Sequence, residues 1–376
     1  MDQEILKKIT KLRHELHANP ELSMQEVRTK QRLMAFLREN TSLSVVDRGR
    51  WFYAYYPCGK EDAGRIAFRA DFDALPMEEG LALPYASNNP GVSHKCGHDG
   101  HSAALCGLAM ELERRGAGQD VYLIFQHAEE IGAGGADCAG LLAEKQIGQV
   151  YAFHNRSGYP QGSVILKEGV AQCTSKGLTV QMTGKPAHAS QPEDGKNPAA
   201  ALARLVLLAE GGEAAGEYDG FVLNTVVHVD IGSPNFGIAA AEGRVSMTLR
   251  ADYEADLQKL ETKIRAKARA LADETGLSVR FAEQDFFPET VNTPGAVAAV
   301  RKAAIRCGFP IISMEHSFRA SEDFGYYVKA CPGAIVYIGN GEDYPQIHTR
   351  EYDFNDAVLE TAVELFAELA RSPRLC

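Results

Sequence analysis

The alternation of helix-like and strand-like segments constrains the fold of this chain more than any other feature. Amphipathic spacing predicts a helix over residues 3–18. Short apolar runs predict strands over 65–70 and 121–125, with a helix over 102–116 between them. Such alternation is typical of an α/β layered sheet. We therefore expect a larger α/β domain with a mixed sheet and helices on both faces.

The middle of the chain follows a different order. Strands are predicted over residues 176–183, 221–231, 244–251 and 277–282, with helices over 198–209 and 256–274. The order β-α-β-β-α-β is that of a ferredoxin-like α+β sandwich. Longer helices return over 295–307 and 354–370. We therefore predict a small domain at 175–285, inserted into a larger one whose two parts are 1–174 and 286–376.

The composition excludes several classes of function. With 376 residues the chain is too long for one ordinary core. A net charge of −11 argues against nucleic acid, because phosphate binding needs a basic surface. We find no signal peptide pattern, and no apolar run approaches the roughly 20 residues that span a bilayer. The eight cysteines, Cys376 among them, are scattered, which indicates free thiols in a reducing compartment. We expect a cytoplasmic protein with no nucleic-acid or membrane partner.

Residues 94–101 concentrate side chains that bind metals. This segment, His-Lys-Cys-Gly-His-Asp-Gly-His, holds three of the chain's eleven histidines, a cysteine and an aspartate. Each can bind a transition metal or orient a residue that does. The two glycines let the backbone turn tightly enough to aim several side chains at one point. The segment therefore predicts a metal site.

Acidic and imidazole side chains recur directly after predicted strands. Asp71 and Asp73 follow one strand, Glu129 and Glu130 follow the next, and His154 follows a third. Ligand sites of open α/β sheets lie at the carboxyl ends of strands. We therefore expect three strands to deliver polar groups to one edge of the sheet.

The adjacent pair Glu129-Glu130 can divide the work of a hydrolytic site. One carboxylate binds metal, while the other takes a proton from a metal-bound water. An isolated pair of glutamates usually begins a solvated helix. Here the pair follows an apolar strand and precedes the glycine-rich residues 131–135, which favours a functional role.

Other interpretations stay open at this point. Cys96 and His98 fit a structural zinc site, although no second Cys-x-x-Cys or His-x-x-x-His pair accompanies them. Cys96 also fits a thiol nucleophile activated by a nearby histidine. Asp73 either caps a turn or orients a ligating histidine. Taken alone, His188 and His348 are weak signals.

Several motifs, in order and at compatible spacings, match a known family. The matching segments are Arg13 to His17, Asn19 to Ser23, Arg69 to Pro76, Cys96 to His101, Ala128 to Glu130, His154, Gly184 to Ser190, Ser321 to Phe324, and His348. They run almost from end to end. On these segments the chain resembles the two-metal amidohydrolases of the aminoacylase and carboxypeptidase group, in the branch of hippurate hydrolase and the plant auxin-conjugate hydrolases.

The resemblance implies an α/β catalytic domain interrupted by a smaller lid domain. The metal ligands that it implies are Cys96, His98, Glu130, His154 and His348. It implies Glu129 as the general base, which later hands its proton to the leaving amine. Asp73 and Asp99 would be supporting carboxylates. His188 would be the lid histidine that stabilises the oxyanion, across a dimer interface.

The implied ligand set suits two divalent metal ions per subunit. Thiolate, imidazole and carboxylate together favour zinc or manganese and also tolerate cobalt or nickel. Two ions that share one water would lower its pKa towards neutrality and polarise the amide carbonyl. Closure of the lid would exclude bulk water.

The chain departs from the branch at three places. His127 stands where proline is usual, and we interpret it as a strand-end residue rather than a ligand. Pro186 and Ala187 replace a common Gly-Gly before His188. Residues 235–239 stand where Asn-x-x-Pro-Asp is frequent, which bears on substrate recognition rather than on the metal chemistry.

We therefore expect a metal-dependent hydrolase that cleaves the amide bond, not an ester, of an N-acyl amino acid or related small conjugate. The expected partners are this small substrate and a second copy of the chain, in a homodimer through the lid. The alternative chemistry is a dipeptidase or carboxypeptidase on the same site. A non-catalytic metal-binding protein is an alternative of another class, and a cysteine hydrolase that uses Cys96 is a third.

Overall fold

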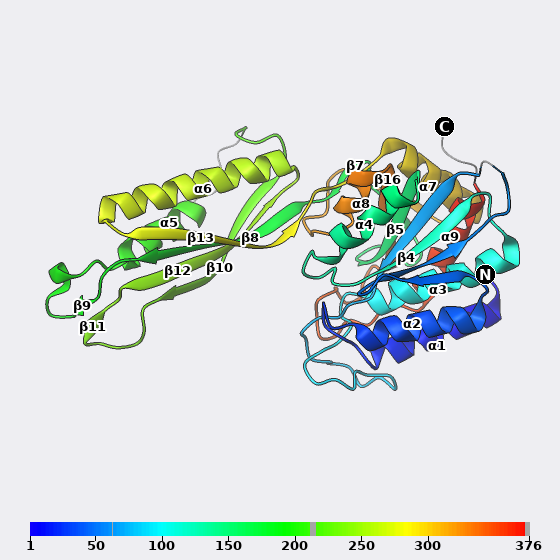
Figure 1. The fold of residues 1–376 in the computed structure, drawn as a ribbon, viewed down its shortest axis with the longest axis horizontal. Helices are drawn as coiled ribbons and strands as arrows, with labels where there is room; N and C mark the ends of the chain where they lie inside the picture. Colours follow the sequence, from blue (N-terminus) through cyan, green and yellow to red (C-terminus); the bar gives the residue numbers. More distant parts are fainter. Residues whose placement is uncertain (62, 211–215, 373–376) are drawn as a thin grey trace. The chain divides into compact units, whose positions relative to one another are not determined.

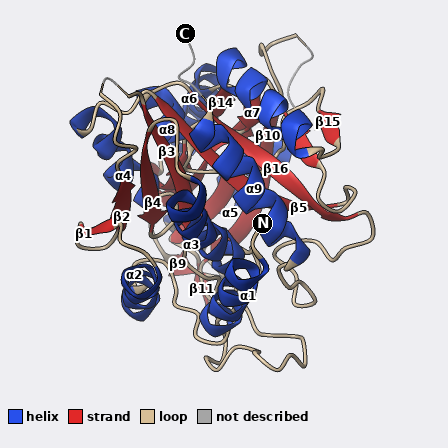
Figure 2. Ribbon diagram, turned by 90° about the vertical axis from the view of Figure 1, so that its right-hand side faces the viewer, coloured by secondary structure: helices blue, strands red, loops and turns tan. Residues whose placement is uncertain are grey.

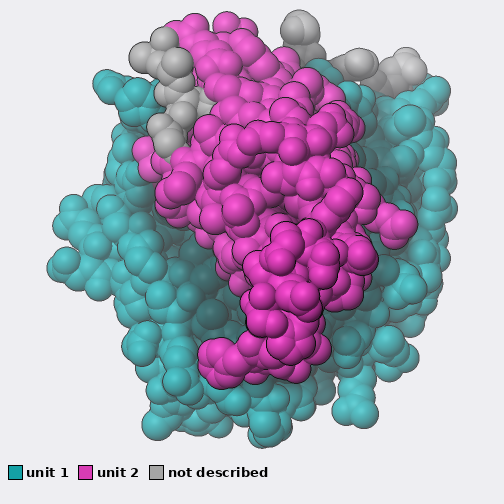
Figure 3. Space-filling model, turned by 90° about the vertical axis from the view of Figure 1, so that its left-hand side faces the viewer, with its two compact units in different colours: residues 1–171, 290–317, 322–376 teal, residues 172–289, 318–321 magenta. Residues whose placement is uncertain are grey.

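The computed structural model describes residues 1–61, 63–210 and 216–372, so Cys376 lies outside the described residues. Contacts divide the chain into two compact units. Unit 1 comprises residues 1–171, 290–317 and 322–376, and unit 2 comprises residues 172–289 and 318–321 (Figure 3). The second unit thus also includes residues 172–174, 286–289 and 318–321, which the sequence prediction assigned to the larger domain.

In its described residues, unit 1 is built on an eight-stranded mixed sheet. In spatial order the strands are β1 (Ser44–Asp47), β2 (Phe52–Tyr56), β4 (Asp120–Gln126), β3 (Arg65–Asp71), β5 (Gln149–Ser157), β16 (Gly333–Gly341), β6 (Val164–Leu166) and β15 (Ile311–Ser313). The central strands β4, β3, β5 and β16 are parallel, whereas β1, β2 and β6 each have an antiparallel neighbour. The mixed sheet predicted from the sequence is confirmed.

Helices cover both faces of this sheet (Figure 2). One face carries α1 (Gln3–His17), α3 (His98–Arg115), α7 (Pro294–Cys307) and α9 (Ala357–Arg371). The other carries α4 (Gly134–Glu144) and α8 (Gly325–Ala330), while α2 (Val27–Asn40) packs on α3 and β1. In α1 the spacing of Ile5, Ile9, Leu12 and Leu16 turns one apolar stripe into the core. A two-stranded ribbon, β7 (Gly169–Gln172) with β14 (Thr290–Asn292), completes the described strands of this part.

The described part of unit 2 forms a four-stranded antiparallel sheet with two helices on one face (Figure 1). Its elements in chain order are β8 (Thr174–Thr183), α5 (Ala199–Glu210), β10 (Val222–Ile231), β12 (Glu242–Ala251), α6 (Glu254–Thr275) and β13 (Ser278–Phe287). The spatial order β10-β12-β8-β13 is that of the ferredoxin-like sandwich that the sequence predicted. Along β8, Leu178, Val180 and Met182 point into the core, and the residues between them face away.

A short ribbon extends unit 2. It pairs β9 (Ala187–His188) with β11 (Ile238–Ala239), and a 3₁₀ turn (Pro192–Asp194) follows β9. His188 lies directly opposite Ile238 in this ribbon. The segment in which the chain departs from the family branch therefore carries the strand that pairs with His188.

Two predicted boundaries near the metal-binding motif are wrong. The helix expected from residue 102 begins at His98, so residues 98–101 of the motif form its first turn. Gly97 makes this early start feasible, because its φ of 104° suits glycine and an added Cβ would lie 2.4 Å from Asn155. Strand β5 continues to Ser157, which places His154 inside a strand rather than after one.

Two predictions about the whole chain can be compared with the described residues. All seven described cysteines are free thiols, as their scattered positions predicted. In the part of the chain that the structure describes, no helix is both long and apolar enough to cross a membrane.

Candidate metal centre

Three neighbouring strands converge on the predicted site. β4, β3 and β5 lie side by side and run parallel, so their carboxyl ends share one edge of the sheet. Asp71 is the last residue of β3, and Glu129 follows β4 after a two-residue step. Each strand is buried along most of its length, which anchors these side chains in the core of unit 1.

The five predicted metal ligands form two triads that share the sulfur of Cys96. The first triad consists of Cys96, His98 and His154, and the second of Cys96, Glu130 and His348. Within each triad the candidate ligand atoms all lie within 4.8 Å of one another. The Cys96 sulfur is 3.4 Å from Nε2 of His154, and Nε2 of His348 is 3.6 Å from a Glu130 oxygen. Two such adjacent triads can hold two cations close together.

Unsatisfied buried atoms show that this donor set fits a cation. In the described structure, Nε2 of His98 and one carboxylate oxygen of Glu130 are buried without a hydrogen-bond partner. Burial, reinforced by Asp73, raises the pKa of Glu130 to about 7. Orphaned polar atoms are costly in a protein interior, and a divalent cation would satisfy them and favour the ionised ligands.

The thiol of Cys96 is a poor candidate for a nucleophile in the protein alone. Burial first, and then the negative charge of Glu130, raise its pKa well above the usual range. A catalytic thiol needs the opposite shift, towards the thiolate. A metal ligand has no such need, because the bound ion itself removes the proton.

The two supporting carboxylates have different partners. Asp73 accepts hydrogen bonds from Nδ1 of His98 and from the backbone N–H of Glu130, both at 3.0 Å. It thereby orients one predicted ligand and fixes the backbone of another. Asp99 accepts from Nδ1 of His17 at 2.8 Å, so it ties the start of α3 to α1 rather than to a predicted ligand.

Glu129 is enclosed rather than solvated. Only 5% of its surface is exposed, and one of its oxygens is 3.9 Å from Nε2 of His98. Burial, together with the negative charges of Glu322 and Asp323, raises its pKa well above the usual range. The alternative in which the glutamate pair begins a solvated helix is wrong, because α4 begins only at Gly134.

Close to Glu129 lies a buried ion-pair hub, centred on Arg69, that the sequence prediction missed. Arg69 is 2.6 Å from Asp71, 3.0 Å from Glu322 and 2.7 Å from Asp323, and it donates to Gln126 at 2.9 Å. Part of this hub had a local signal, because Arg69 and Asp71 are two residues apart on one strand and share a face. Its other members are Gln126 on β4, and Glu322 and Asp323 just before α8. They are too far from Arg69 in the sequence for any local pattern to predict the contact.

Several other histidines of unit 1 are buried but lie outside the two triads. His101 contacts Asp71 at 2.7 Å and Asn155 at 2.6 Å through its two ring nitrogens. His94 and His127 are buried, and neither ring has a hydrogen-bond partner among the described residues. His127 belongs to none of the possible metal-binding groups found in the described residues, and the strand-end interpretation stays a prediction.

The predicted lid histidine belongs to unit 2. His188 is exposed, and its Nδ1 accepts from the backbone N–H of Ser190 at 3.2 Å and lies 2.7 Å from the Ser190 hydroxyl. When Nδ1 is the acceptor, the neutral ring carries its proton on Nε2. The imidazole is thereby prepared to donate a hydrogen bond outwards.

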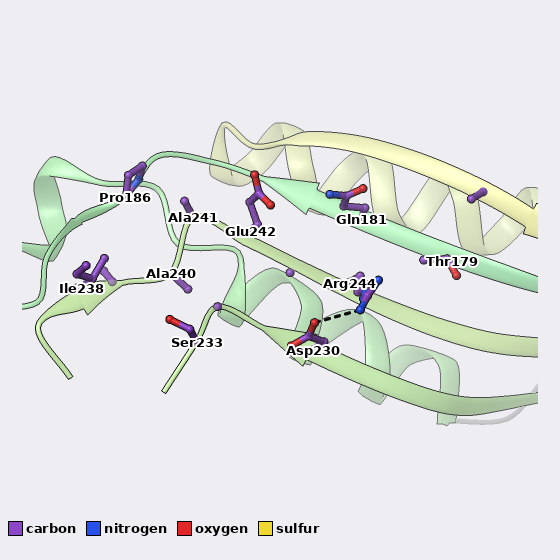
Figure 4. A pocket seen from close by; sticks show the side chains of 14 residues that line it. Thr179, Gln181, Pro186, Asp230, Ser233, Ile238, Ala240, Ala241, Glu242 and Arg244 are labelled. Atoms are coloured by element: carbon purple, nitrogen blue, oxygen red, sulfur yellow. Dashed lines mark hydrogen bonds and ion pairs between the residues drawn. The ribbon is translucent and has the colours of Figure 1, made fainter. Parts of the chain in front are cut away.

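Unit 2 also contains a pocket of about 710 Å³ (Figure 4). It is lined by Pro186 and Ile238 of the ribbon region and by the polar face of the sheet, including Thr179 and Gln181. Arg244 and Asp230 form an ion pair in its wall. None of the predicted metal ligands lines this pocket.

Comparisons with known proteins agree with this geometry. The chain is 30% identical over 378 residues to the N-acetylcysteine deacetylase of Bacillus subtilis, covering 98% of this chain and 97% of that protein. It is 30% identical over 371 residues to the hippurate hydrolase of Campylobacter jejuni, covering 96% and 95%. A crystal structure of the Bacillus subtilis YXEP protein, described as a dinuclear metal binding peptidase from the M20 family, superposes with a TM-score of 0.84 at 27% identity. That likeness covers 98% of both chains.

A family model for peptidase family M20/M25/M40 matches residues 67–372, a range that includes every predicted metal ligand and Glu129. Together with the two similar relatives, this match is sufficient to assign the family. The chain belongs to peptidase family M20/M25/M40, as an enzyme of its amidohydrolase and deacetylase group, which hydrolyses carbon–nitrogen bonds.

Proposed function

We propose that this enzyme cleaves the amide bond of N-acyl amino acids, or of closely related small conjugates, with the help of two divalent metal ions. One observation carries the proposal: two triads of metal-binding side chains share Cys96 and lie beside the buried carboxylate of Glu129. The relatives named for N-acetylcysteine and hippurate act on amides of single amino acids, which supports a substrate of this class.

Cys96, His98 and His154 would hold one ion, and Cys96, Glu130 and His348 the other. Zinc or manganese suits this mixture of sulfur, nitrogen and oxygen donors, with cobalt or nickel as alternatives. When bound, such ions supply Lewis-acid polarisation of the carbonyl and a lowered pKa for a water.

In this scheme Glu129 moves the proton. It takes the proton from the attacking water and then delivers it to the nitrogen of the leaving amine. The raised pKa of the buried carboxyl suits a group that must carry a proton for part of the cycle. Asp73 holds His98 in the orientation that leaves Nε2 free.

His188 would donate from Nε2 to the oxyanion that develops on the former carbonyl oxygen. Its contacts with Ser190 favour the tautomer that this role requires. A homodimer through unit 2, in which His188 serves the partner's metal centre, is part of the same proposal. The edge strands β10 and β13 of its four-stranded sheet, which pair with no further strand among the described residues, support this part.

The test is a substrate panel run through one cycle of chelation. N-acetyl and N-benzoyl amino acids are compared with dipeptides and a matched ester, using purified protein under reducing conditions. We expect amide hydrolysis to disappear after chelation and to return on addition of Zn²⁺ or Mn²⁺, with N-acyl amino acids preferred.

Each alternative has its own outcome in this experiment. Preference for dipeptides would replace the proposal with a dipeptidase or carboxypeptidase. Activity that survives the chelator would indicate a cysteine hydrolase that uses Cys96. Bound metal with no hydrolysis of any panel member would indicate a metal-binding protein without catalysis.

A further inference from the structure

His348 is the predicted ligand with the least regular backbone. It lies in the connection between β16 and α9, outside any helix or strand, and its side chain is 48% exposed. Its φ of 60° is unfavourable for a residue with a Cβ. Such strain persists only where the surroundings determine the conformation. Some other part of unit 1 must therefore hold this connection in place.

Lys95 contacts the connection at two points, His348 itself and Tyr352, which follows it. Its backbone oxygen accepts a hydrogen bond from the N–H of His348 at 2.7 Å. Its side-chain ammonium donates to the backbone oxygen of Tyr352, also at 2.7 Å. Lys95, the neighbour of the predicted ligand Cys96, thus holds the connection at the predicted ligand His348 and at Tyr352.

Glu79 neutralises the buried charge of Lys95. The side chain of Lys95 is fully buried, and a buried ammonium is costly unless it is paired. Glu79 forms that ion pair, and its other oxygen accepts from Nε2 of His17 at 2.9 Å. Because Glu79 is held by α1 through His17, the position of Lys95 is tied to the rigid helical layer.

The residue after Glu79 adds a further tie. The N–H of Gly80 donates to the backbone oxygen of Arg350 at 3.2 Å. A Cβ at position 80 would lie 2.6 Å from that oxygen, so only glycine allows this approach. The segment that carries Glu79 therefore contacts the His348 connection directly as well as through Lys95.

We propose that Lys95 and Glu79 are positioning residues for His348, and that their ion pair sets the affinity of the metal position formed by Cys96, Glu130 and His348. This inference rests on the proposed metal centre. A merely structural ion pair would stabilise the fold equally with or without metal. A positioning pair must in addition distinguish between the two metal positions, and this difference can be measured.

The experiment titrates Mn²⁺ into metal-free protein by calorimetry and counts the ions bound per chain. His348→Ala first identifies which binding step depends on His348. We expect Glu79→Gln to weaken that same step by about 10- to 100-fold, the usual effect of removing a partner of a metal ligand, and to leave the other step unchanged. Urea unfolding of the metal-free variants measures stability separately.

Glu364→Gln is the matched control. Glu364 pairs with Arg115 in the same unit, away from the His348 connection. Burial opposes the shift, but hydrogen bonds from cationic partners lower the pKa of both Glu79 and Glu364 to about 2. The control should therefore lose comparable stability while both Mn²⁺ steps keep their affinities.

Gly80→Ala is a second route to the same result, since it displaces Arg350 without removing a charge. Selective loss of the His348 step in Glu79→Gln and Gly80→Ala supports the inference. Equal weakening of both steps, or none, in a folded variant overturns it while leaving the metal centre intact. Failure of the unsubstituted protein to bind Mn²⁺ or Zn²⁺ would instead remove the proposed centre itself.

Discussion

Two ion-pair groups, one in each unit, hold their charged side chains in opposite ways. In unit 1, Arg69 is 1% exposed and pairs with the fully buried Asp71 and Asp323. In unit 2, Arg244 and Asp230 form a 3.4 Å pair with side chains that are 55% and 51% exposed. The first arrangement removes charge from water, whereas the second leaves it at the surface.

The comparison of these two ion-pair groups shows which side chains are held in one fixed position. A buried charge without a partner is strongly destabilising, and Arg69 is fixed by three carboxylates at once. A surface pair contributes only about 0–1 kcal/mol, and its side chains keep their freedom. We therefore expect substitutions in the buried part of unit 1 to have large effects on stability or catalytic rate. Substitutions on the surface of unit 2 should affect at most the catalytic rate.

The largest effect is expected for Glu129→Gln. Loss of the general base should lower kcat by about 10²- to 10⁴-fold, while the ligand triads keep their metal. Kinetics on the preferred N-acyl amino acid and a metal count per chain measure both properties. Glu130→Gln is the control, and it should lose metal as well as activity. Near-normal turnover in Glu129→Gln would remove the assigned role.

A large loss of stability is expected for Arg69→Met. Three carboxylates would lose a shared cation, and breaking a buried pair costs about 3–5 kcal/mol. Urea unfolding of the metal-free protein measures the loss. Arg244→Met, the surface counterpart in unit 2, should cost no more than about 1 kcal/mol. Equal losses in the two variants would show that burial does not distinguish these ion pairs.

His188→Ala should separate chemistry from stability. We expect kcat to fall by about 10²- to 10³-fold, as for removal of an oxyanion donor, with an unchanged urea midpoint because the side chain is exposed. Ser190→Ala should have a smaller effect, since the backbone N–H of Ser190 still reaches Nδ1. A His188→Ala enzyme with full activity would exclude a role in the reaction.

The last prediction concerns a pH dependence of stability that arises from His17. Burial lowers its pKa, but hydrogen bonds to Asp99 and Glu79 outweigh burial and raise the pKa from 6.5 to about 9. A raised histidine pKa stabilises the fold fully below about pH 6.5, and this contribution disappears as the pH rises through 9. The shift corresponds to roughly 3 kcal/mol.

Urea unfolding of metal-free protein between pH 6 and 10 measures this contribution. The difference between the unsubstituted chain and His17→Gln should be largest at pH 6 and should shrink as the pH approaches 10. A difference that stays constant, or grows with pH, would contradict a cationic His17 in the folded state.

Much of the fold could be predicted because its signals are local. The stripe of Ile5, Ile9, Leu12 and Leu16 predicted α1, and the strands predicted for the middle of the chain lie close to those of unit 2. The start of α3 at His98 could not be predicted, because the two glycines and the polar residues around them resemble a loop. Only the conformation of Gly97 in the fold allows the helix to begin there. Short strands such as β6 and β15, and the small helix α8, are stabilised by their neighbours rather than by their own residues.

In the candidate site, too, some features could be predicted from the sequence and others depend on the tertiary structure. Residue types alone pointed to metal chemistry at residues 94–101 and at the glutamate pair, because ligand chemistry depends on the residue itself. The full set of Cys96, His98, Glu130, His154 and His348 came only from the resemblance to a known family. Their grouping into two triads with a shared sulfur depends on the parallel order of β4, β3 and β5 and on the return of the chain to His348. The pairs Arg69 with Asp323 and Lys95 with Tyr352 likewise join residues more than 250 positions apart. Nothing in the local sequence specifies such partners, since burial of charge is a property of the folded core.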